Sequence, residues 1–227
     1  MRKVGILCAS DTELAPFLKN MDVRRTTEKA MLRFHEGALR KIPAVAVYSG
    51  VCKVNAAIAA ELLIEVFGAE AVINAGTAGG IDPGVGLFDT VIGERSVYHD
   101  VAKDILTEFH PWMPSVYFPS DPELLSAARR YAKIASRPLL FGTIATGERF
   151  VENGDRASIL QKHSPLAVDM ETASAAHVCY VNGVPFLAVR SVTDTGEDSG
   201  PEVFERNCER ASEIAAEVTA GILSLWA

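Results

Sequence analysis

The sequence predicts a single α/β domain built on a central mixed, mostly parallel sheet flanked by helices. Three observations lead to this prediction. Short apolar segments recur along the chain, helical patterns separate them, and no linker, repeat or low-complexity tract divides the 227 residues. Segments that are apolar on both faces are typical of buried parallel strands, and their alternation with helices is typical of α/β folds. A chain of this length suits one large domain, so we expect it to span residues 1–227.

Four apolar segments are the clearest predicted strands, and they lie at residues 4–9, 44–49, 71–75 and 186–192. Between the second and third, an apolar residue recurs every four positions over 54–67, and Gly68 follows. This spacing predicts a helix that ends at the glycine, and therefore a strand–helix–strand unit.

Further helices are predicted in the second half of the chain. Ser120 and Glu123 have the spacing of a capping box, which predicts a helix that begins there. Two more helices are expected at 172–181 and from about residue 201 to the end. The segment 100–119 has four aromatic residues and three prolines without periodicity, which is typical of a long functional loop.

Composition excludes several classes of protein. The net charge is −7, with 22 basic and 29 acidic residues, which argues against a protein that mainly binds nucleic acid or anionic lipid. No segment reaches the ~20 apolar residues that a membrane span needs. The four cysteines are scattered and the five histidines lack metal-ligand spacing, so we expect a cytoplasmic protein without metal or cofactor.

A glycine-rich stretch follows the predicted strand 71–75. It contains Thr77, Ala78 and Gly79, flanked by Gly76 and Gly80. Its spacing differs from that of a dinucleotide-binding loop. Glycine clusters at strand ends are more often simple turns, so the stretch by itself leaves both a turn and a ligand contact open.

Three carboxylates stand at or just after predicted strand ends, where ligands bind in open α/β sheets: Glu13, Glu171 and Asp194. Each also has a purely structural interpretation. Glu13 forms a capping box with Ser10, Glu171 can favour a helix N-terminus, and Asp194 can be a turn or N-cap residue. Arg190 lies within an apolar strand, and a buried arginine needs a carboxylate partner.

Seven segments in order resemble the 5'-methylthioadenosine/S-adenosylhomocysteine nucleosidases of the purine nucleoside phosphorylase superfamily. They are GILCASDTE near the start, SGVCKVNAA (49–57), INAGTAGG (73–80), VYHD (97–100), TGERFV (146–151), VDMETASAAHVC (168–179) and VRSVTD (189–194). The resemblance implies a phosphorylase/hydrolase-like three-layer fold. It also implies hydrolysis of the bond between adenine and ribose in these nucleosides and in 5'-deoxyadenosine, as a step of methionine salvage and without a cofactor.

The resemblance implies a role for each carboxylate. Asp194 matches the acid that protonates N7 of adenine, and Glu13 matches the base that activates water, with Arg190 nearby. Glu171 matches the acceptor for the ribose hydroxyls. In glycoside cleavage one protonated carboxyl group usually acts as the acid and one ionised carboxylate acts as the base. The substrate-contacting residues implied are Phe150 and Val151 at the base, Met170 at the ribose, Val51 and Phe204 near the 5' substituent, and Thr77, Ala78, Gly79 and Thr193.

The resemblance further implies a homodimer in which Phe109 and Trp112, from the segment 100–119, complete the partner subunit's pocket. The sequence leaves open whether the segment instead closes the pocket of its own chain or forms a local aromatic cluster over the sheet edge. The chain departs from the family pattern in three places. It has Ser10-Asp11-Thr12-Glu13 for the more common Met-Glu-Glu-Glu, Gly50-Val51-Cys52-Lys53 for Gly-Ile-Gly-Lys, and Thr193-Asp194 for Ser-Asp. The first two changes leave the preferred 5' substituent open.

Three alternatives to this interpretation stay open. A related nucleosidase, such as a futalosine hydrolase, would share the acids and differ in its 5' substituent. A nucleoside phosphorylase would need a phosphate site, whereas Asp11 and Glu13 make the corresponding stretch acidic. A nucleoside-binding protein without catalysis would keep the fold.

Overall fold

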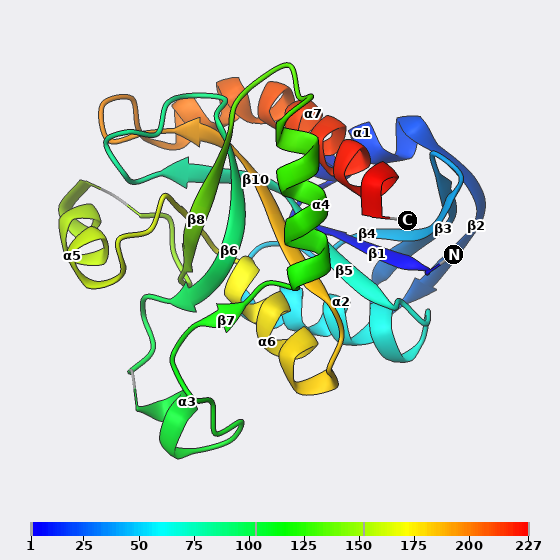
Figure 1. Ribbon diagram of the computed structural model, residues 1–227, viewed down its shortest axis with the longest axis horizontal. Coiled ribbons are helices and arrows are strands. Elements are labelled where there is room, and N and C mark those ends of the chain that lie inside the picture. Colours follow the sequence, from blue (N-terminus) through cyan, green and yellow to red (C-terminus); the bar gives the residue numbers. More distant parts are fainter. Residues whose placement is uncertain (1, 103, 152, 227) are drawn as a thin grey trace.

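A computed structural model describes residues 2–102, 104–151 and 153–226, and in it one ten-stranded mixed sheet forms the centre of the molecule (Figure 1). The strands are β1 (Val4–Cys8), β2 (Met21–Lys29), β3 (Leu32–Leu39), β4 (Ile42–Tyr48), β5 (Ala71–Gly80), β6 (Thr90–Tyr98), β7 (Phe118–Pro119), β8 (Leu139–Thr146), β9 (Ala167–Asp169) and β10 (Phe186–Asp194). The helices are α1 (Asp11–Asn20), α2 (Lys53–Glu65), α3 (Ile105–Glu108), α4 (Pro122–Ala132), α5 (Asn153–His163), α6 (Thr172–Asn182) and α7 (Pro201–Trp226).

Parallel pairings form the centre of the sheet. β1 lies between β4 and β5 and is parallel to both, and β10 is parallel to the other side of β5. The antiparallel hairpin β2–β3 extends the sheet beyond β4. β5, β10, β6, β8 and β9 pair in succession and then back to β5, so these five strands close into a ring.

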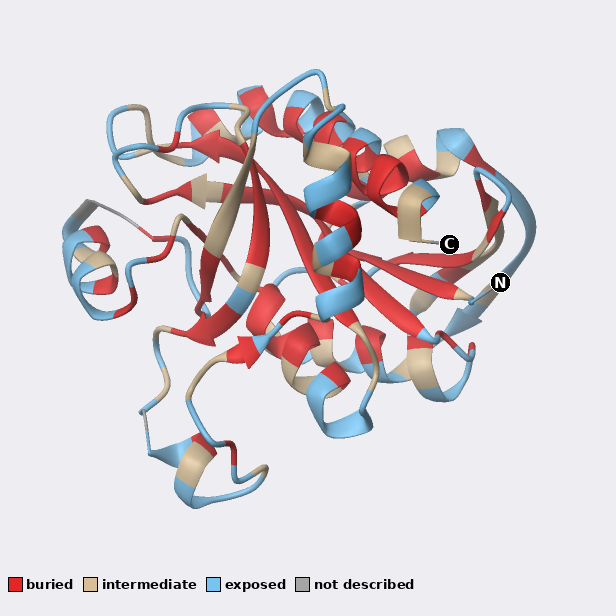
Figure 2. Cartoon of the chain, in the orientation of Figure 1, coloured by how far each residue is buried: buried red, intermediate tan, exposed pale blue. Residues whose placement is uncertain are grey.

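Helices cover the sheet in two outer layers, which confirms the predicted three-layer α/β fold (Figure 1). α1, α4 and α7 lie on one face, and α2 and α6 pack against each other on the opposite face. Each face has its own buried core, because the strands are apolar on both sides. Figure 2 shows the central strands and the inward sides of the helices as buried, and the edge strand β2 and the outer sides of the helices as exposed.

The four predicted strands and the predicted helices α2, α6 and α7 are present. The hairpin β2–β3 was not predicted, and its sequence explains why. β2 reads MDVRRTTEK and only its first residue is buried, so an edge strand of this kind carries no apolar pattern. β5 is also longer than predicted, because the glycine-rich stretch Gly76–Gly80 continues the strand rather than forming a turn.

The predicted capping box at Ser120 is wrong. α4 begins at Pro122, and the carboxylate of Asp121 accepts a hydrogen bond from the Leu124 amide at 2.9 Å. The Ser120 hydroxyl instead donates to the Gly93 carbonyl at 2.7 Å. Proline favours the first turn of a helix, because its missing N–H is not needed there. Pro122 therefore takes the first helical position, and Asp121, the residue before it, is the N-cap.

The segment 100–119 is only partly an irregular loop, since it contains α3 and β7, and residue 103 lies outside the described residues. Its aromatic residues differ in burial, and Tyr117 is half-buried. Phe118 is buried and packs against Tyr98 and His177, so it belongs to the core. Phe109 and Trp112 are 60% and 67% exposed. The segment therefore combines a core anchor with two exposed aromatic side chains.

Candidate active site

A cavity of about 250 Å³ lies where the carboxyl ends of β5, β9 and β10 meet the N-terminus of α1. Glu13, Glu171 and Asp194 all line it. So do the nine residues expected to contact substrate, namely Val51, Thr77, Ala78, Gly79, Phe150, Val151, Met170, Thr193 and Phe204. Phe109 and Trp112 are not among its lining residues. The structure thus brings twelve predicted site residues, from distant segments of the chain, together in the wall of one cavity.

Glu13 is both a helix-start residue and part of the cavity. Its amide donates to the Ser10 hydroxyl at 3.2 Å, so Ser10 caps α1 as the sequence predicts. The carboxylate accepts hydrogen bonds from the Ala9 amide at 2.6 Å and from the amide and hydroxyl of Thr77, both at 2.7 Å. These donors hold the buried carboxylate in one orientation beside the cavity.

Arg190 lies behind the cavity wall and is fully buried. Its Nε is 2.8 Å from an Asp169 oxygen, and its Nη2 is 3.3 Å from Glu171 Oε2. Its Nη1 is 4.0 Å from Glu13 Oε1. The expectation that a buried arginine has a carboxylate partner is confirmed, and one cation here serves three carboxylates.

Sequence reasoning missed Asp169 and Asn74, which complete this network. Asp169 also accepts a hydrogen bond from the Thr146 hydroxyl at 2.6 Å, and Asn74 Oδ1 accepts one from Arg190 Nη2 at 2.7 Å. The sequence contains a signal for one of these two residues. Asn74 is a polar residue within an apolar strand, as Arg190 is, and two such residues on neighbouring strands of one sheet form a natural pair.

Glu171 is buried at the junction of β9 and α6. Its Oε1 accepts a hydrogen bond from the Cys52 amide at 2.9 Å. Burial raises the pKa of Glu171 to about 7, with Asp169 and Glu13 adding to the rise and Arg190 opposing it. The group therefore changes charge near neutral pH.

Asp194 is the last residue of β10 and is 1% exposed. The Thr193 hydroxyl donates to its Oδ1 at 2.9 Å, and Nη2 of Arg156, from α5, lies 3.1 Å from its Oδ2. Burial raises the pKa of Asp194, while the hydrogen bond from Thr193 and the charge of Arg156 oppose the rise. Sequence reasoning did not identify Arg156.

Glu13 and Asp194 lie beside different points of the same strand. The Glu13 carboxyl group lies against Gly76, and Asp194 Oδ2 would be 3.2 Å from a Cβ atom on Gly79. Three residues along a strand span about 10 Å. The two carboxyl groups thus contact different points of β5, about three residues apart.

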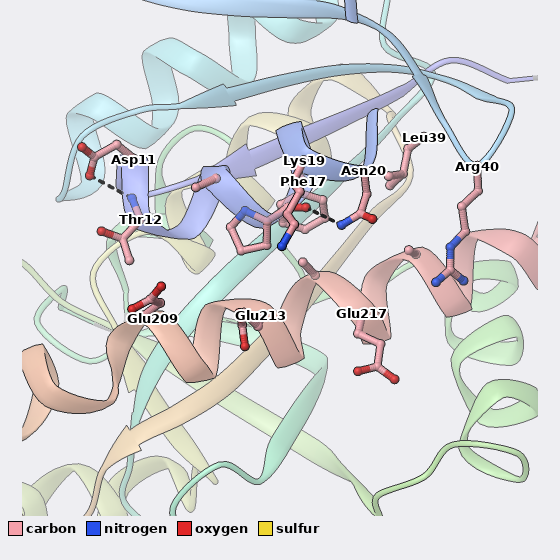
Figure 3. Close-up of a pocket in the computed structure, with 14 residues that line it drawn as sticks. Asp11, Thr12, Phe17, Lys19, Asn20, Leu39, Arg40, Glu209, Glu213 and Glu217 are labelled. Atoms are coloured by element: carbon pink, nitrogen blue, oxygen red, sulfur yellow. Dashed lines mark hydrogen bonds between the residues drawn. The ribbon is translucent and has the colours of Figure 1, made fainter. Parts of the chain in front are cut away.

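A second and larger cavity, of about 840 Å³, is a surface groove between α1 and α7 (Figure 3). It is lined by charged side chains such as Asp11, Glu213 and Glu217 and by none of the predicted site residues. Ligand sites in proteins are mostly apolar with a few convergent polar groups, which describes the smaller cavity. We therefore place the candidate active site there.

Among the residues that the structure describes, no group of three His, Cys, Asp or Glu side chains could hold a metal ion. Within the same residues, no helix is long and apolar enough to cross a membrane.

Fold and site together define an α/β protein with a small-molecule cavity, in which buried carboxyl groups lie beside aromatic and apolar side chains. A family model described as the phosphorylase superfamily matches residues 3–224. The 5'-methylthioadenosine/S-adenosylhomocysteine nucleosidase of Geobacillus kaustophilus is 34% identical over 229 residues, which cover 98% of this chain and 97% of the relative.

Solved structures agree with the sequence comparison. The same-named nucleosidase of Neisseria meningitidis, in complex with methylthio-immucillin-A, has a TM-score of 0.90 and 30% identity over 98% of this chain and 99% of that one. The futalosine hydrolase of Helicobacter pylori has a TM-score of 0.89 and 26% identity over 98% and 97%. The chain belongs to the phosphorylase superfamily and, within it, to the 5'-methylthioadenosine/S-adenosylhomocysteine nucleosidase family.

Proposed function

We propose that this protein is an enzyme that hydrolyses the N-glycosidic bond of 5'-methylthioadenosine and S-adenosylhomocysteine, and also of 5'-deoxyadenosine, to adenine and the 5-substituted ribose. The observation that carries the proposal is that Glu13, Glu171 and Asp194 line one cavity together with Phe150. Water addition to a nucleoside needs a base for the water, an acid for the leaving purine and a support for the positive sugar, and this cavity offers a group for each.

In the proposed reaction, Glu13 accepts the proton from the attacking water. Thr77 and Ala9 hold the carboxylate in place. The 4.0 Å between Arg190 Nη1 and Glu13 Oε1 is a distance that a water molecule can bridge by hydrogen bonds to both groups. The oxygen of such a water would form the new bond to the anomeric carbon as the bond to N9 breaks.

Asp194 is the proposed acid, which gives its proton to N7 so that adenine leaves as a neutral base. Burial favours the protonated carboxyl group that this role requires. Phe150 and Val151 lie in the wall of the same cavity, where an aromatic ring can stack on a purine and a backbone group can bind its edge.

Glu171 is the proposed acceptor for the ribose hydroxyls, with Met170 next to it in the chain and beside the sugar. The charged form of Glu171 also favours the positive charge that develops on the ribose ring. Val51 and Phe204 provide apolar surface in the cavity wall for a methylthio group.

A homodimer is the proposed working unit, and an exposed apolar surface supports it. Val54, Ile58 and Val66 of the helical segment after β4 are 68%, 42% and 48% exposed, whereas Ala59 and Leu63 face the core. Exposed apolar patches of this kind are typical of interfaces between subunits. Phe109 and Trp112 are exposed as well, and we propose that they reach the partner's pocket.

We further propose that the enzyme acts in methionine salvage in the cytoplasm. Both nucleosides carry the sulfur of methionine or homocysteine, and their cleavage is a first step toward its recovery. The cysteines Cys8, Cys52, Cys179 and Cys208 are all free thiols, which suits a reducing compartment.

The test is release of adenine from 5'-methylthioadenosine by purified protein in phosphate-free buffer with a chelator present, followed by chromatography of both products. We expect adenine and free methylthioribose. A dependence on phosphate, with a sugar 1-phosphate as product, would instead identify a phosphorylase. Cleavage of futalosine in preference to the methylthio and homocysteine nucleosides would identify the other nucleosidase, and binding without turnover would identify a nucleoside-binding protein.

A further inference from the structure

Arg156 is a cationic side chain of α5 that is only 8% exposed. Its Nη1 donates to the Gly80 carbonyl at 2.5 Å, and its Nη2 donates to Asp194 Oδ2 at 3.1 Å. Gly80 ends β5 and Asp194 ends β10. One guanidinium group therefore joins α5 to the ends of two strands at the cavity.

α5 has few other attachments to the body of the protein. Most of its described residues are exposed or half-buried, and besides Arg156 only Ile159 and His163 are buried among them. Ile159 packs in a small apolar cluster that includes Val151 and Val168, both of which line the cavity. The helix follows closely after Phe150 and Val151, so a contact that fixes α5 also fixes this part of the cavity wall.

The contact also fixes the Asp194 carboxyl group. Oδ1 accepts from the Thr193 hydroxyl and Oδ2 accepts from Arg156, so the group is held from both ends. A further charge near Asp194 is that of Asp198, before α7, which forms its own ion pair with Arg206 at 3.0 Å. Arg156 is thus the cation in direct contact with Asp194 within the described chain.

We propose that Arg156 is a positioning residue that orients the Asp194 carboxyl group and holds α5, with Phe150 and Val151, against the purine half of the cavity. This rests on the function proposed above. Arg156 transfers no proton itself. When Asp194 gives its proton to N7, a buried carboxylate forms, and the guanidinium stabilises that charge by a charge-assisted hydrogen bond.

The same contact has a predictable effect on pH dependence. A cation at hydrogen-bond distance favours the ionised carboxylate, so it lowers the pH above which Asp194 has lost its proton. Removal of the cation should let Asp194 stay protonated to higher pH, while the reaction itself becomes slower because the product carboxylate is less stable.

The experiment compares Arg156→Met, which keeps the length and removes the charge, with Arg156→Lys, which keeps the charge. Lys162→Met is the matched control, because it removes an exposed cation from the same helix. We expect Arg156→Met to lower kcat/KM about tenfold or more and to move the alkaline limb of its pH profile upward by about one pH unit. Arg156→Lys should keep the alkaline limb at its wild-type pH and recover part of kcat/KM. Lys162→Met should have the wild-type kcat/KM and pH profile.

Two further measurements do not depend on turnover. The pKa of Asp194, followed by carbon NMR and assigned with Asp194→Asn, should be higher in Arg156→Met than in the wild type. Amide hydrogen exchange in α5 should be faster in the same variant. An inactive wild type would contradict the proposed function and leave these two tests in force. An unchanged pKa together with unchanged exchange in α5 would overturn the role of Arg156.

Discussion

The carboxyl group of Glu13 lies directly against Gly76, in space that a Cβ atom on that residue would occupy. Glycine at this position of β5 therefore decides whether the carboxylate can reach the Thr77 amide and hydroxyl. The contact links a residue of the first helix to the third strand of the parallel centre.

We expect Gly76→Ala to displace the Glu13 carboxylate and to lower kcat by about 10²-fold or more, because the base loses its position relative to the water. Gly196→Ala is the matched control, since a Cβ there meets open space. Steady-state rates and thermal unfolding of both variants give the result. Wild-type turnover in Gly76→Ala would show that the position of Glu13 does not matter for the chemistry.

Substitution of the two proposed proton-transfer groups should affect turnover much more than binding. Asp194→Asn removes the acid and Glu13→Gln removes the base, and each should lower kcat by about 10²–10⁴-fold. Adenine binding, measured by calorimetry, should persist in Glu13→Gln. If Asp194→Asn turns over 5'-methylthioadenosine at close to the wild-type rate, the acid has been assigned to the wrong residue.

Glu171 should give nucleoside binding a pH dependence that adenine binding lacks. Because burial raises its pKa to about 7, its ionised fraction falls as the pH drops below that value. The ionised form is the better acceptor for ribose hydroxyls, so affinity for a nucleoside should fall about tenfold per pH unit well below the pKa. Calorimetric titrations with a non-hydrolysable nucleoside and with adenine, from pH 5 to 8, test this. In Glu171→Gln the nucleoside should lose this additional dependence, so that the two ligands follow the same pH profile.

Cys52 occupies a backbone conformation that suits glycine. Its φ of 81° and ψ of 164° lie in a region used almost only by glycine, and this geometry presents its amide to Glu171. Such strain costs about 1–3 kcal/mol, of which the greater flexibility of unfolded glycine offsets a part. We expect Cys52→Gly to raise the free energy of unfolding by about 1 kcal/mol and Tm by about 2–4 °C.

Cys52→Ala separates this effect from loss of the thiol. Alanine keeps the strain, so its Tm should stay at or below that of the wild type. Equal stabilisation by both variants in calorimetric melting would show that the thiol, and not the backbone, was responsible.

The proposed homodimer predicts a solution mass of about twice 24.4 kDa by light scattering. Ile58→Asp, in the exposed apolar stripe of α2, should reduce the mass to that of one chain and lower activity. Met31→Asp is a suitable control, since Met31 is 94% exposed in the turn between β2 and β3. A variant that is monomeric and fully active would exclude a pocket shared between subunits.

Trp112→Ala tests the shared pocket more directly. It should weaken binding of nucleosides with apolar 5' groups while adenine binding stays unchanged, because the side chain is expected near the 5' end of the partner's substrate. The ratio of the two dissociation constants, compared with that of the wild type, is the measurement. An unchanged ratio would place Trp112 outside the pocket.

The sequence by itself determined those elements whose residue pattern matches the position that they occupy in the fold. The apolar strands β1, β4, β5 and β10 are buried on both faces, so their composition alone identifies them. Glu13 and Asp194 follow β1 and β10, which are both parallel to β5, so the carboxyl ends of these strands bring the two side chains to the same edge of the sheet. Glu171 follows β9, which is antiparallel to β5, so its place in the same cavity depends on the tertiary structure. The need of buried Arg190 for carboxylates was predictable for the same reason, because an apolar strand leaves a charge no access to water.

Other features depend on which surfaces of the chain come into contact, and only the tertiary structure decided these. Val54, Ile58 and Val66 are apolar yet exposed, whereas Leu63 and three alanines of α2 are buried, and the alanines let the helix approach the sheet closely. The exposed strand β2 has no apolar periodicity and forms only because β3 supplies its hydrogen-bond partners. Asp169 and Arg156 have no sequence pattern that marks them. Their roles arise from desolvation, because a charge removed from water must find its partner wherever the folded chain places one, and here those partners are Arg190 and Asp194.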